Sequence, residues 1–286
     1  MGTSMKIGAH VSSSGKLEFA IDRGAAIGAE AVQVFLSGPQ QWRSKTLTPK
    51  DAQAYKGKAA ESGIDTTFFH GVYLINLGTA NPENLLKGID SLVTYQQAAE
   101  AIGCLGTIFH VGSHGGAGFE TVLPQVVKSM VQVLESSPDG PWLIIENSAG
   151  MGRSIGSSFA EIGTIIKEIG SPRVKVCLDT QHSFANGYNV VTKDGLDAAM
   201  DEFDHEIGLQ RLVAVHANDS KCPFSGGLDR HENIGEGFIG LKGFEVIMGH
   251  LAFQNTTFLL EVPGFDQKGP DQKNIDLLKN LRSSRG

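Results

Sequence analysis

Acidic and histidine residues recur in this sequence at the ends of short, strand-like apolar runs. Six consecutive runs end in such a residue: His70, His110, Glu146, Asp179, His216 and Glu261. Imidazole combined with carboxylate suits zinc or a similar transition metal, whereas magnesium prefers oxygen donors alone. A single histidine at a strand end is usually structural. Burying six such groups is unfavourable without a common partner, so the repeated pattern predicts a metal site.

Two short motifs extend this set of candidate ligands. Asp179 and His182 lie three residues apart and would face opposite ways on a strand, so the chain is expected to turn there and direct His182 towards a neighbouring site. Asp229 and His231 are two residues apart, which on an extended segment puts both on one side, where they could bind one ion. The alternative for this second pair is a surface Asp–His pair, because the glycine-rich stretch 224–227 precedes it.

The elements that must position these groups alternate eight times between strand and helix. Strands are predicted at residues 6–11, 31–36, 66–71, 107–112, 142–147, 174–180, 212–219 and 257–263. Helices are predicted at about 16–28, 50–62, 83–102, 119–135, 158–169, 194–207, 241–250 and 271–282. This order predicts an α/β fold, a single (β/α)8 TIM barrel domain over residues 5–286, with the metal cluster at the C-terminal face of its strands. A doubly wound open sheet is the alternative, but it usually carries a glycine-rich loop where this chain has His10-Val11-Ser12.

Composition limits the possible functions. The chain has 286 residues, 41% of them hydrophobic, and a net charge of −7, which alone opposes nucleic-acid binding. Three bound divalent ions would bring that charge to about −1, so it does not exclude DNA. No apolar run is long enough to span a membrane. The three widely spaced cysteines suggest a reducing, cytoplasmic location. Residues 1–4 are interpreted as an expression remnant.

At these residues the sequence resembles the endonuclease IV family of abasic-site endonucleases. The motifs that carry the resemblance are HGVYLINLG at 70–78, CLDTQH at 177–182 and NDSK at 218–221, followed by Asp229-Arg230-His231 and Gly235-Glu236-Gly237. The similarity runs in the same order from about residue 5 to 282. Two departures are Gln181, where the family often has cysteine, and Val262, where threonine is common.

The resemblance implies three zinc ions, which Mn²⁺ or Fe²⁺ could partly replace. The implied ligands are His70, His110 and Glu146 for the first ion, Glu146, Asp179, His216 and Glu261 for the second, and His182, Asp229 and His231 for the third. It also implies in-line hydrolysis of the phosphodiester 5′ to an abasic site, leaving a 3′-hydroxyl and a 5′-deoxyribose phosphate, and trimming of 3′ ends. The implied catalytic residues are Glu261 and Glu146, and Glu261 would orient the attacking water or accept its proton.

The implied partner is double-stranded DNA with abasic sites or blocked 3′ ends, without a membrane or an obligate protein partner. The expected DNA contacts are Tyr73 and Leu74, just beyond His70, together with Gln40 and Gln41. Leu74 could instead cap the barrel core. Gln40 stands where a relative has an arginine that enters DNA.

Two other functions are compatible with parts of this pattern. A sugar isomerase or epimerase of the xylose-isomerase-like barrels would share the fold and a metal–carboxylate centre. It would have no need of the pair Asp229 and His231. A non-enzymatic DNA- or metal-binding protein would fail to nick an abasic duplex.

Overall fold

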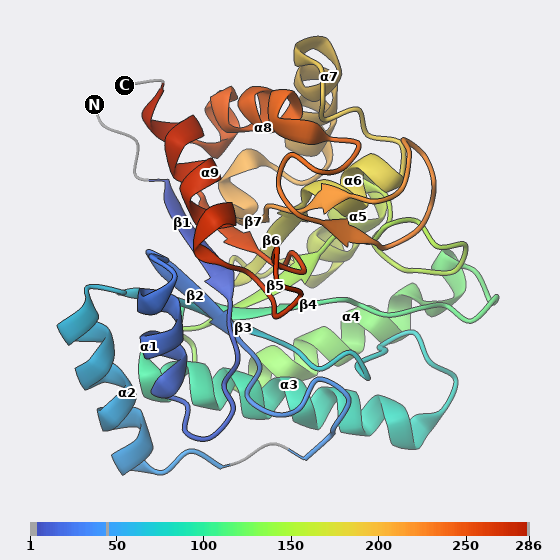
Figure 1. Ribbon diagram of the computed structural model, residues 1–286. Helices are drawn as coiled ribbons and strands as arrows, with labels where there is room; N and C mark the ends of the chain where they lie inside the picture. The colour runs from blue at the N-terminus through green and yellow to red at the C-terminus, as the bar shows by residue number, and fades with distance from the viewer. Residues whose placement is uncertain (1–4, 44–45, 285–286) are drawn as a thin grey trace.

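The computed structural model describes residues 5–43 and 46–284 (Figure 1), so the expected remnant at residues 1–4 lies outside the described part. Eight parallel strands close into a barrel in the order β1-β10-β7-β6-β5-β4-β3-β2, with the helices around it. The predicted TIM barrel is confirmed and the open-sheet alternative is wrong. The barrel strands are β1 Lys6–His10, β2 Ala31–Val34, β3 Thr66–His70, β4 Gly106–Phe109, β5 Trp142–Glu146, β6 Val174–Asp179, β7 Leu212–His216 and β10 Thr257–Leu260.

The helices are α1 Phe19–Ala26, α2 Pro49–Ser62, α3 Pro82–Ile102, α4 Phe119–Glu135, α5 Phe159–Ile169, α6 Thr180–Ala185, α7 Lys193–Glu206, α8 Gly240–Gly249 and α9 Gln272–Ser283, with 3-10 turns at Leu209–Arg211 and Leu251–Phe253. Local sequence explains several starts. Thr48 forms a reciprocal capping box with Asp51, and the Asn81 side chain accepts a hydrogen bond from the backbone of Asn84. In both helices a proline follows the cap, where its missing N–H costs nothing.

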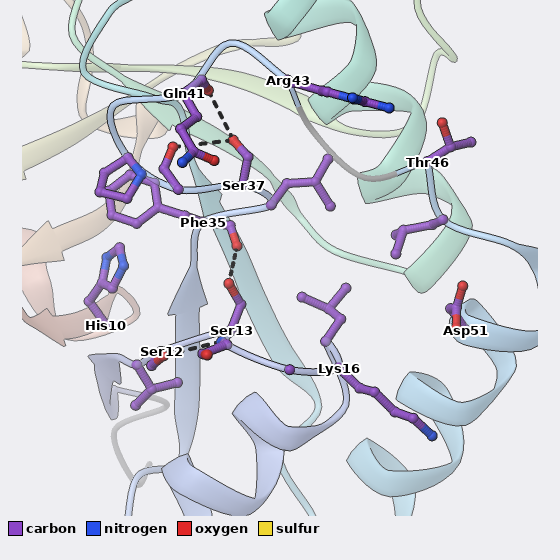
Figure 2. Close-up of a pocket in the computed structure, with 18 residues that line it drawn as sticks. His10, Ser12, Ser13, Lys16, Phe35, Ser37, Gln41, Arg43, Thr46 and Asp51 are labelled. Carbon is purple, nitrogen blue, oxygen red and sulfur yellow. Dashed lines mark hydrogen bonds between the residues drawn. The ribbon is translucent and has the colours of Figure 1, made fainter.

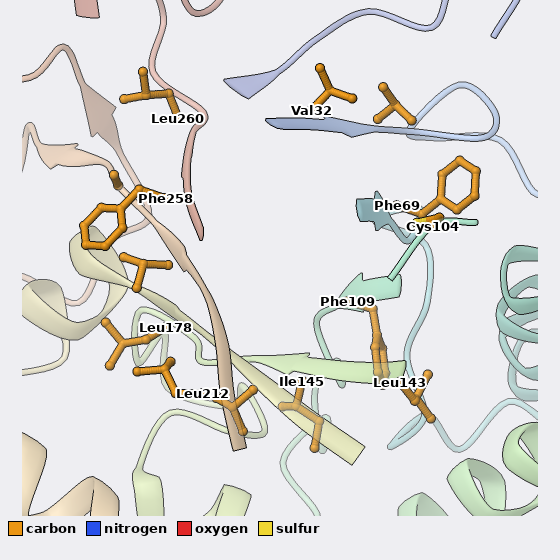
Figure 3. Packing of buried hydrophobic residues seen from close by; sticks show 14 of the residues in the cluster. Val32, Phe69, Cys104, Phe109, Leu143, Ile145, Leu178, Leu212, Phe258 and Leu260 are labelled. Carbon is orange, nitrogen blue, oxygen red and sulfur yellow. The ribbon is translucent and has the colours of Figure 1, made fainter. Parts of the chain in front are cut away.

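Apolar side chains fill the barrel on both faces of its strands. An outer core packs between strands and helices, and Figure 3 shows its members Val32, Phe69, Phe109 and Ile145 on successive strands. The barrel interior holds Ala31, Phe68, Ile108, Ile144, Cys177, Ala214 and Leu259. Side chains two residues apart on a strand share a face. The positions two residues beyond these interior residues are Gln33, His70, His110, Glu146, Asp179, His216 and Glu261. A polar layer therefore lies directly on the apolar interior, at the C-terminal end of the barrel.

Two elements differ from the sequence prediction. The predicted strand 212–219 is wrong as one element, because β7 ends at His216. After two residues outside any strand comes β8, Asp219–Ser220, which pairs antiparallel with β9, His231–Glu232. Helix α6 was also not predicted, and it starts directly after β6 because the Asp179 carboxylate caps it by accepting from the His182 backbone at 2.8 Å. Both elements lie beside the polar layer.

Cys104, Cys177 and Cys222 are all buried and unbridged. In the described residues, 5–43 and 46–284, each helix is too short or too polar to cross a membrane.

Candidate metal centre

Glu146 lies at the centre of the polar layer, with four histidine rings around its buried carboxylate. One oxygen, Oε2, is 3.1 Å from His70 Nε2 and 3.3 Å from His110 Nε2. The other, Oε1, is 2.9 Å from His216 Nδ1 and 3.4 Å from His182 Nδ1. Burial alone would raise the pKa of Glu146, but the His110 and His216 rings lower it well below its ordinary value. The Glu146 carboxylate thus faces His70 and His110 with one oxygen, and His216 and His182 with the other.

The inner cluster, defined as Glu146, Asp179, His216 and Glu261, brings its donor atoms within 4.8 Å of one another. The strand register produces this, since Asp179 on β6 and His216 on β7 are paired residues. His216 Nδ1 lies 3.3 Å from Glu261 Oε2 and 3.8 Å from Asp179 Oδ2. Asn218 links the Asp179 carboxylate to the backbone of Glu261, donating to Asp179 Oδ2 at 2.7 Å and accepting from the Glu261 N–H at 2.8 Å.

The outer cluster, defined as His182, Asp229 and His231, draws on α6 and on the loop between β8 and β9. Asp229 Oδ1 is 3.3 Å from His182 Nε2 and 3.2 Å from His231 Nε2. Burial alone would raise the pKa of Asp229, but the two neighbouring imidazole rings lower it. The Asp229 side chain is 49% exposed, unlike those of the inner cluster. The predicted turn after Asp179 and the shared side of Asp229 and His231 both agree with this geometry.

Asp219 holds in place the segment of residues 221–240, which carries Asp229 and His231 of the outer cluster. Its buried carboxylate accepts backbone hydrogen bonds from Gly235, Gly237, Ile239 and Gly240 at 2.9–3.2 Å. A Cβ at Gly237 would lie 2.4 Å from Asp219 Oδ1, so only glycine fits there. This explains the Gly-Glu-Gly motif physically.

The donor atoms suit divalent ions. Within the described part of the chain, His182 Nε2 and His231 Nε2 are buried without a hydrogen-bond partner, and a buried polar atom left in that state is costly. His182 Nδ1, on the far side of the ring, is 2.9 Å from the Asn147 carbonyl, and His70 Nδ1 is 2.8 Å from the Gly71 carbonyl. Histidine ligands are typically held in this way. The site is therefore a candidate for divalent ions, with Glu146 shared between the His70–His110 group and the inner cluster.

Gln33 was not singled out from the sequence, yet it is fully buried in the same layer. It lies between Glu261, His216 and His10, within hydrogen-bonding distance of each. The clue in the sequence was its position, two residues beyond the inward-facing Ala31. His10, which ends β1, also reaches the layer, with Nδ1 3.3 Å from Glu261 Oε1.

The expected DNA-contact residues lie at the rim. Tyr73 is 60% exposed, and its ring centre is 5.8 Å from that of His70. Its backbone donates to the Pro39 carbonyl at 2.9 Å, which joins this loop to the one bearing the exposed Gln40 and Gln41. Leu74 is half-buried and packs against the outer core, so the capping role weighed for it has structural support.

A cleft of about 610 Å³ leads outward from the polar layer between the loops after β1 and β2. Figure 2 shows His10 at one end and Lys16 and Arg43 towards the other, with Ser12, Ser13 and Ser37 between them. Its lining offers hydroxyl groups, two cations and one carboxylate, Asp51, a composition with net positive charge that suits a phosphate-bearing ligand.

Comparison with known proteins identifies the family. A family model described as a xylose isomerase-like TIM barrel matches residues 21–282. The probable endonuclease 4 of Halothermothrix orenii is 36% identical over 276 residues, covering 96% of this chain and 99% of the relative. The probable endonuclease 4 of Cenarchaeum symbiosum is 34% identical over 280 residues, covering 97% and 99%. The chain belongs to the endonuclease IV family.

The solved structures agree with this assignment. Endonuclease IV from Thermus thermophilus superposes with a TM-score of 0.85 at 27% identity, covering 98% of this chain and 99% of that one. A D-tagatose 3-epimerase-like protein reaches a TM-score of 0.75 at 18% identity, a likeness of fold alone. The resemblance read from the sequence motifs is confirmed, and the chain is an enzyme of the metal-dependent nuclease class.

Proposed function

We propose that this protein is a DNA-repair endonuclease that hydrolyses the phosphodiester 5′ to an abasic site, leaving a 3′-hydroxyl and a 5′-deoxyribose phosphate. The observation that carries the proposal is the position of Glu146, which lies between His70 and His110 on one side and the rest of the inner cluster on the other, at the C-terminal face of the barrel. Its relatives named endonuclease 4 support a DNA substrate. Trimming of blocked 3′ ends and a cytoplasmic location belong to the same proposal.

The proposed cofactor is three zinc ions, with Mn²⁺ or Fe²⁺ as partial substitutes. The proposed ligand sets are His70, His110 and Glu146; Glu146, Asp179, His216 and Glu261; and His182, Asp229 and His231. The high share of imidazole favours zinc over magnesium. Bound divalent ions would lower the pKa of a water molecule and neutralise phosphate charge.

Glu261 is the proposed base. Its Oε1 accepts from Gln33 Nε2 at 2.6 Å, and its Oε2 lies towards His216. Burial alone would raise the pKa of Glu261, but the neighbouring His216 and His70 rings lower it, so the carboxylate is ionised at neutral pH. An ionised carboxylate held at both oxygens can orient the attacking water and take its proton.

The DNA would lie across the rim, with its backbone near Lys16 and Arg43 and the lesion beside Tyr73. An exposed aromatic ring next to a missing base can fill the gap in the base stack and offset the cost of unstacking. Leu74, Gln40 and Gln41 are proposed as neighbouring contacts.

The direct test uses purified, zinc-loaded protein and a duplex with one abasic site at a defined position. We expect a single cut 5′ to that site, a 3′-hydroxyl product that a polymerase extends, and no cut in the undamaged duplex. Chelation should abolish the cut and zinc should restore it. A fully loaded protein that leaves the abasic duplex intact, or that epimerises a free ketose, would overturn the proposal.

A further inference from the structure

Gln33 makes three contacts inside the polar layer, and each is to a group with a different role. Its Oε1 is 2.7 Å from His216 Nε2, so this nitrogen donates to it. Its Nε2 donates to Glu261 Oε1 at 2.6 Å and is 2.9 Å from His10 Nδ1. The side chain is 0% exposed. One primary amide has one oxygen and two N–H groups, so this arrangement uses both N–H groups and the oxygen.

The amide can satisfy all three neighbours in only one orientation. Exchanging its oxygen and nitrogen would place an N–H donor against His216 Nε2 and a carbonyl oxygen against the Glu261 carboxylate. With the oxygen towards His216, the ring carries its proton on Nε2. Nδ1, which faces Glu146, Asp179 and Glu261, is then the nitrogen available to bind an ion.

Two other candidate histidine ligands, His70 and His182, are held differently. His70 and His182 direct Nδ1 at the backbone carbonyls of Gly71 and Asn147, at 2.8 and 2.9 Å. Backbone carbonyls are fixed by the fold and survive any substitution. His216 depends instead on a side chain from β2, on the opposite side of β1 and β10 from its own strand.

We propose that Gln33 is the positioning residue of the inner cluster, fixing the tautomer of His216 and the direction of the Glu261 carboxylate for the second ion. This rests on the proposed metal-dependent function. The Gln33 amide must also be uncharged, because a fourth carboxylate beside Glu146, Asp179 and Glu261 would repel the existing negative charges. Partners of this kind typically change metal affinity about 10- to 100-fold when removed.

The test compares Gln33→Met with Gln96→Met. Gln96 is an equally buried glutamine on α3, where its amide faces Thr107 rather than the polar layer. Zinc-loaded proteins are titrated with a chelator, and the ions released are counted at each step. For Gln33→Met we expect one ion of the set to leave at about 10- to 100-fold lower chelator strength. Gln96→Met should release its ions as the wild type does, even if it melts earlier.

A second readout follows the ring proton itself. In ¹⁵N-histidine-labelled, zinc-loaded protein, the His216 Nε2–H should exchange slowly with water in the wild type and in Gln96→Met. In Gln33→Met it should exchange rapidly. Unchanged release and exchange in Gln33→Met, or equal effects in Gln96→Met, would overturn the role of Gln33 while wild-type cleavage stands. A wild type that binds no zinc would instead refute the proposed function.

Discussion

The inner cluster contains Glu146 and Asp179, and the outer cluster lies next to both residues. The two clusters are nevertheless built in different ways. Inner side chains project from adjacent barrel strands, and Asp179 and His216 are fully buried. The outer cluster joins a short helix to a loop, and its Asp229 is half exposed. Strand pairing fixes the inner geometry as part of the fold. The outer geometry depends on one capping carboxylate, Asp179, and one loop anchor, Asp219. The outer cluster should therefore be separable from the rest of the site.

Replacement of the inner base should have the largest effect. Glu261→Gln keeps the size of the side chain and removes its charge, so cleavage of an abasic duplex should fall by roughly 10²- to 10⁴-fold. DNA binding and the outer ion should be retained. Single-turnover cleavage and a gel-shift assay measure the two effects. Near-normal turnover with fold and ions intact would mean that the base is another residue.

Removal of the outer carboxylate should affect one ion only. Asp229→Asn should lower the metal content from about three to about two ions per chain, because only two imidazoles and Asp179, itself a proposed ligand of the second ion, would remain for the outer ion. Elemental analysis after dialysis measures this. Glu236→Gln is the matched control, an acidic residue in the same segment, 221–240, outside both clusters. If Asp229→Asn keeps three ions, or loses all of them, the two clusters are not independent.

The outer cluster should also give the metal-free protein a distinct pH dependence. Burial alone would lower the pKa values of His182 and His231, but their acidic neighbours, Asp229 among them, raise both. A raised histidine pKa stabilises the fold below its unfolded value of about 6.5 and loses that contribution as pH rises through the folded value. The lowered pKa of Asp229 keeps its carboxylate charged throughout this range.

Asp229→Asn should therefore lower the melting temperature of metal-free protein more at about pH 6 than at about pH 9. Thermal unfolding of both proteins after chelation measures the difference. An equal loss of melting temperature at both pH values would show that the charge on the His182 and His231 rings does not stabilise the outer cluster.

At the rim, Tyr73→Ala should weaken binding to abasic DNA and slow cleavage, with little change in metal content or melting temperature. Leu251→Ala is the control, since Leu251 is 79% exposed in the 3-10 turn that precedes β10, at the opposite end of the barrel. Binding assays and calorimetry separate the outcomes. If Tyr73→Ala melts early while its folded fraction cuts normally, then the ring belongs to the core.

The smallest effect is expected from Gln40→Arg. A cation on this exposed loop should tighten binding slightly and steepen its dependence on salt by up to about one phosphate contact. Affinity measured over a series of salt concentrations tests this. An unchanged slope would place Gln40 away from the DNA backbone.

The elements of the barrel and the candidate ligands on its strands could be read from the chain because both follow a period. Strand and helix alternate, and ligand types recur at strand ends, so parallel packing alone brings His70, Glu146 and His216 to one face. Helix α6 and the β8–β9 pair could not be read in this way. Each of these elements is short, and each depends on a residue that is not its neighbour in the sequence. The Asn147 carbonyl holds the ring of His182 on α6, and the Asp219 carboxylate holds the loop after β9.

The sequence by itself determined the fold class, the family and the types of donor available, since these depend on residue identity and local spacing. The tertiary structure decided which donors share a neighbour, that Asp229 stays half exposed, and that an uncharged glutamine on β2 reaches across to His216 and Glu261. Barrel closure is the physical reason. Closure places β2 and β7 around the same polar layer, although β1 and β10 separate them in the sheet. Side chains far apart in the sequence can therefore form hydrogen bonds there.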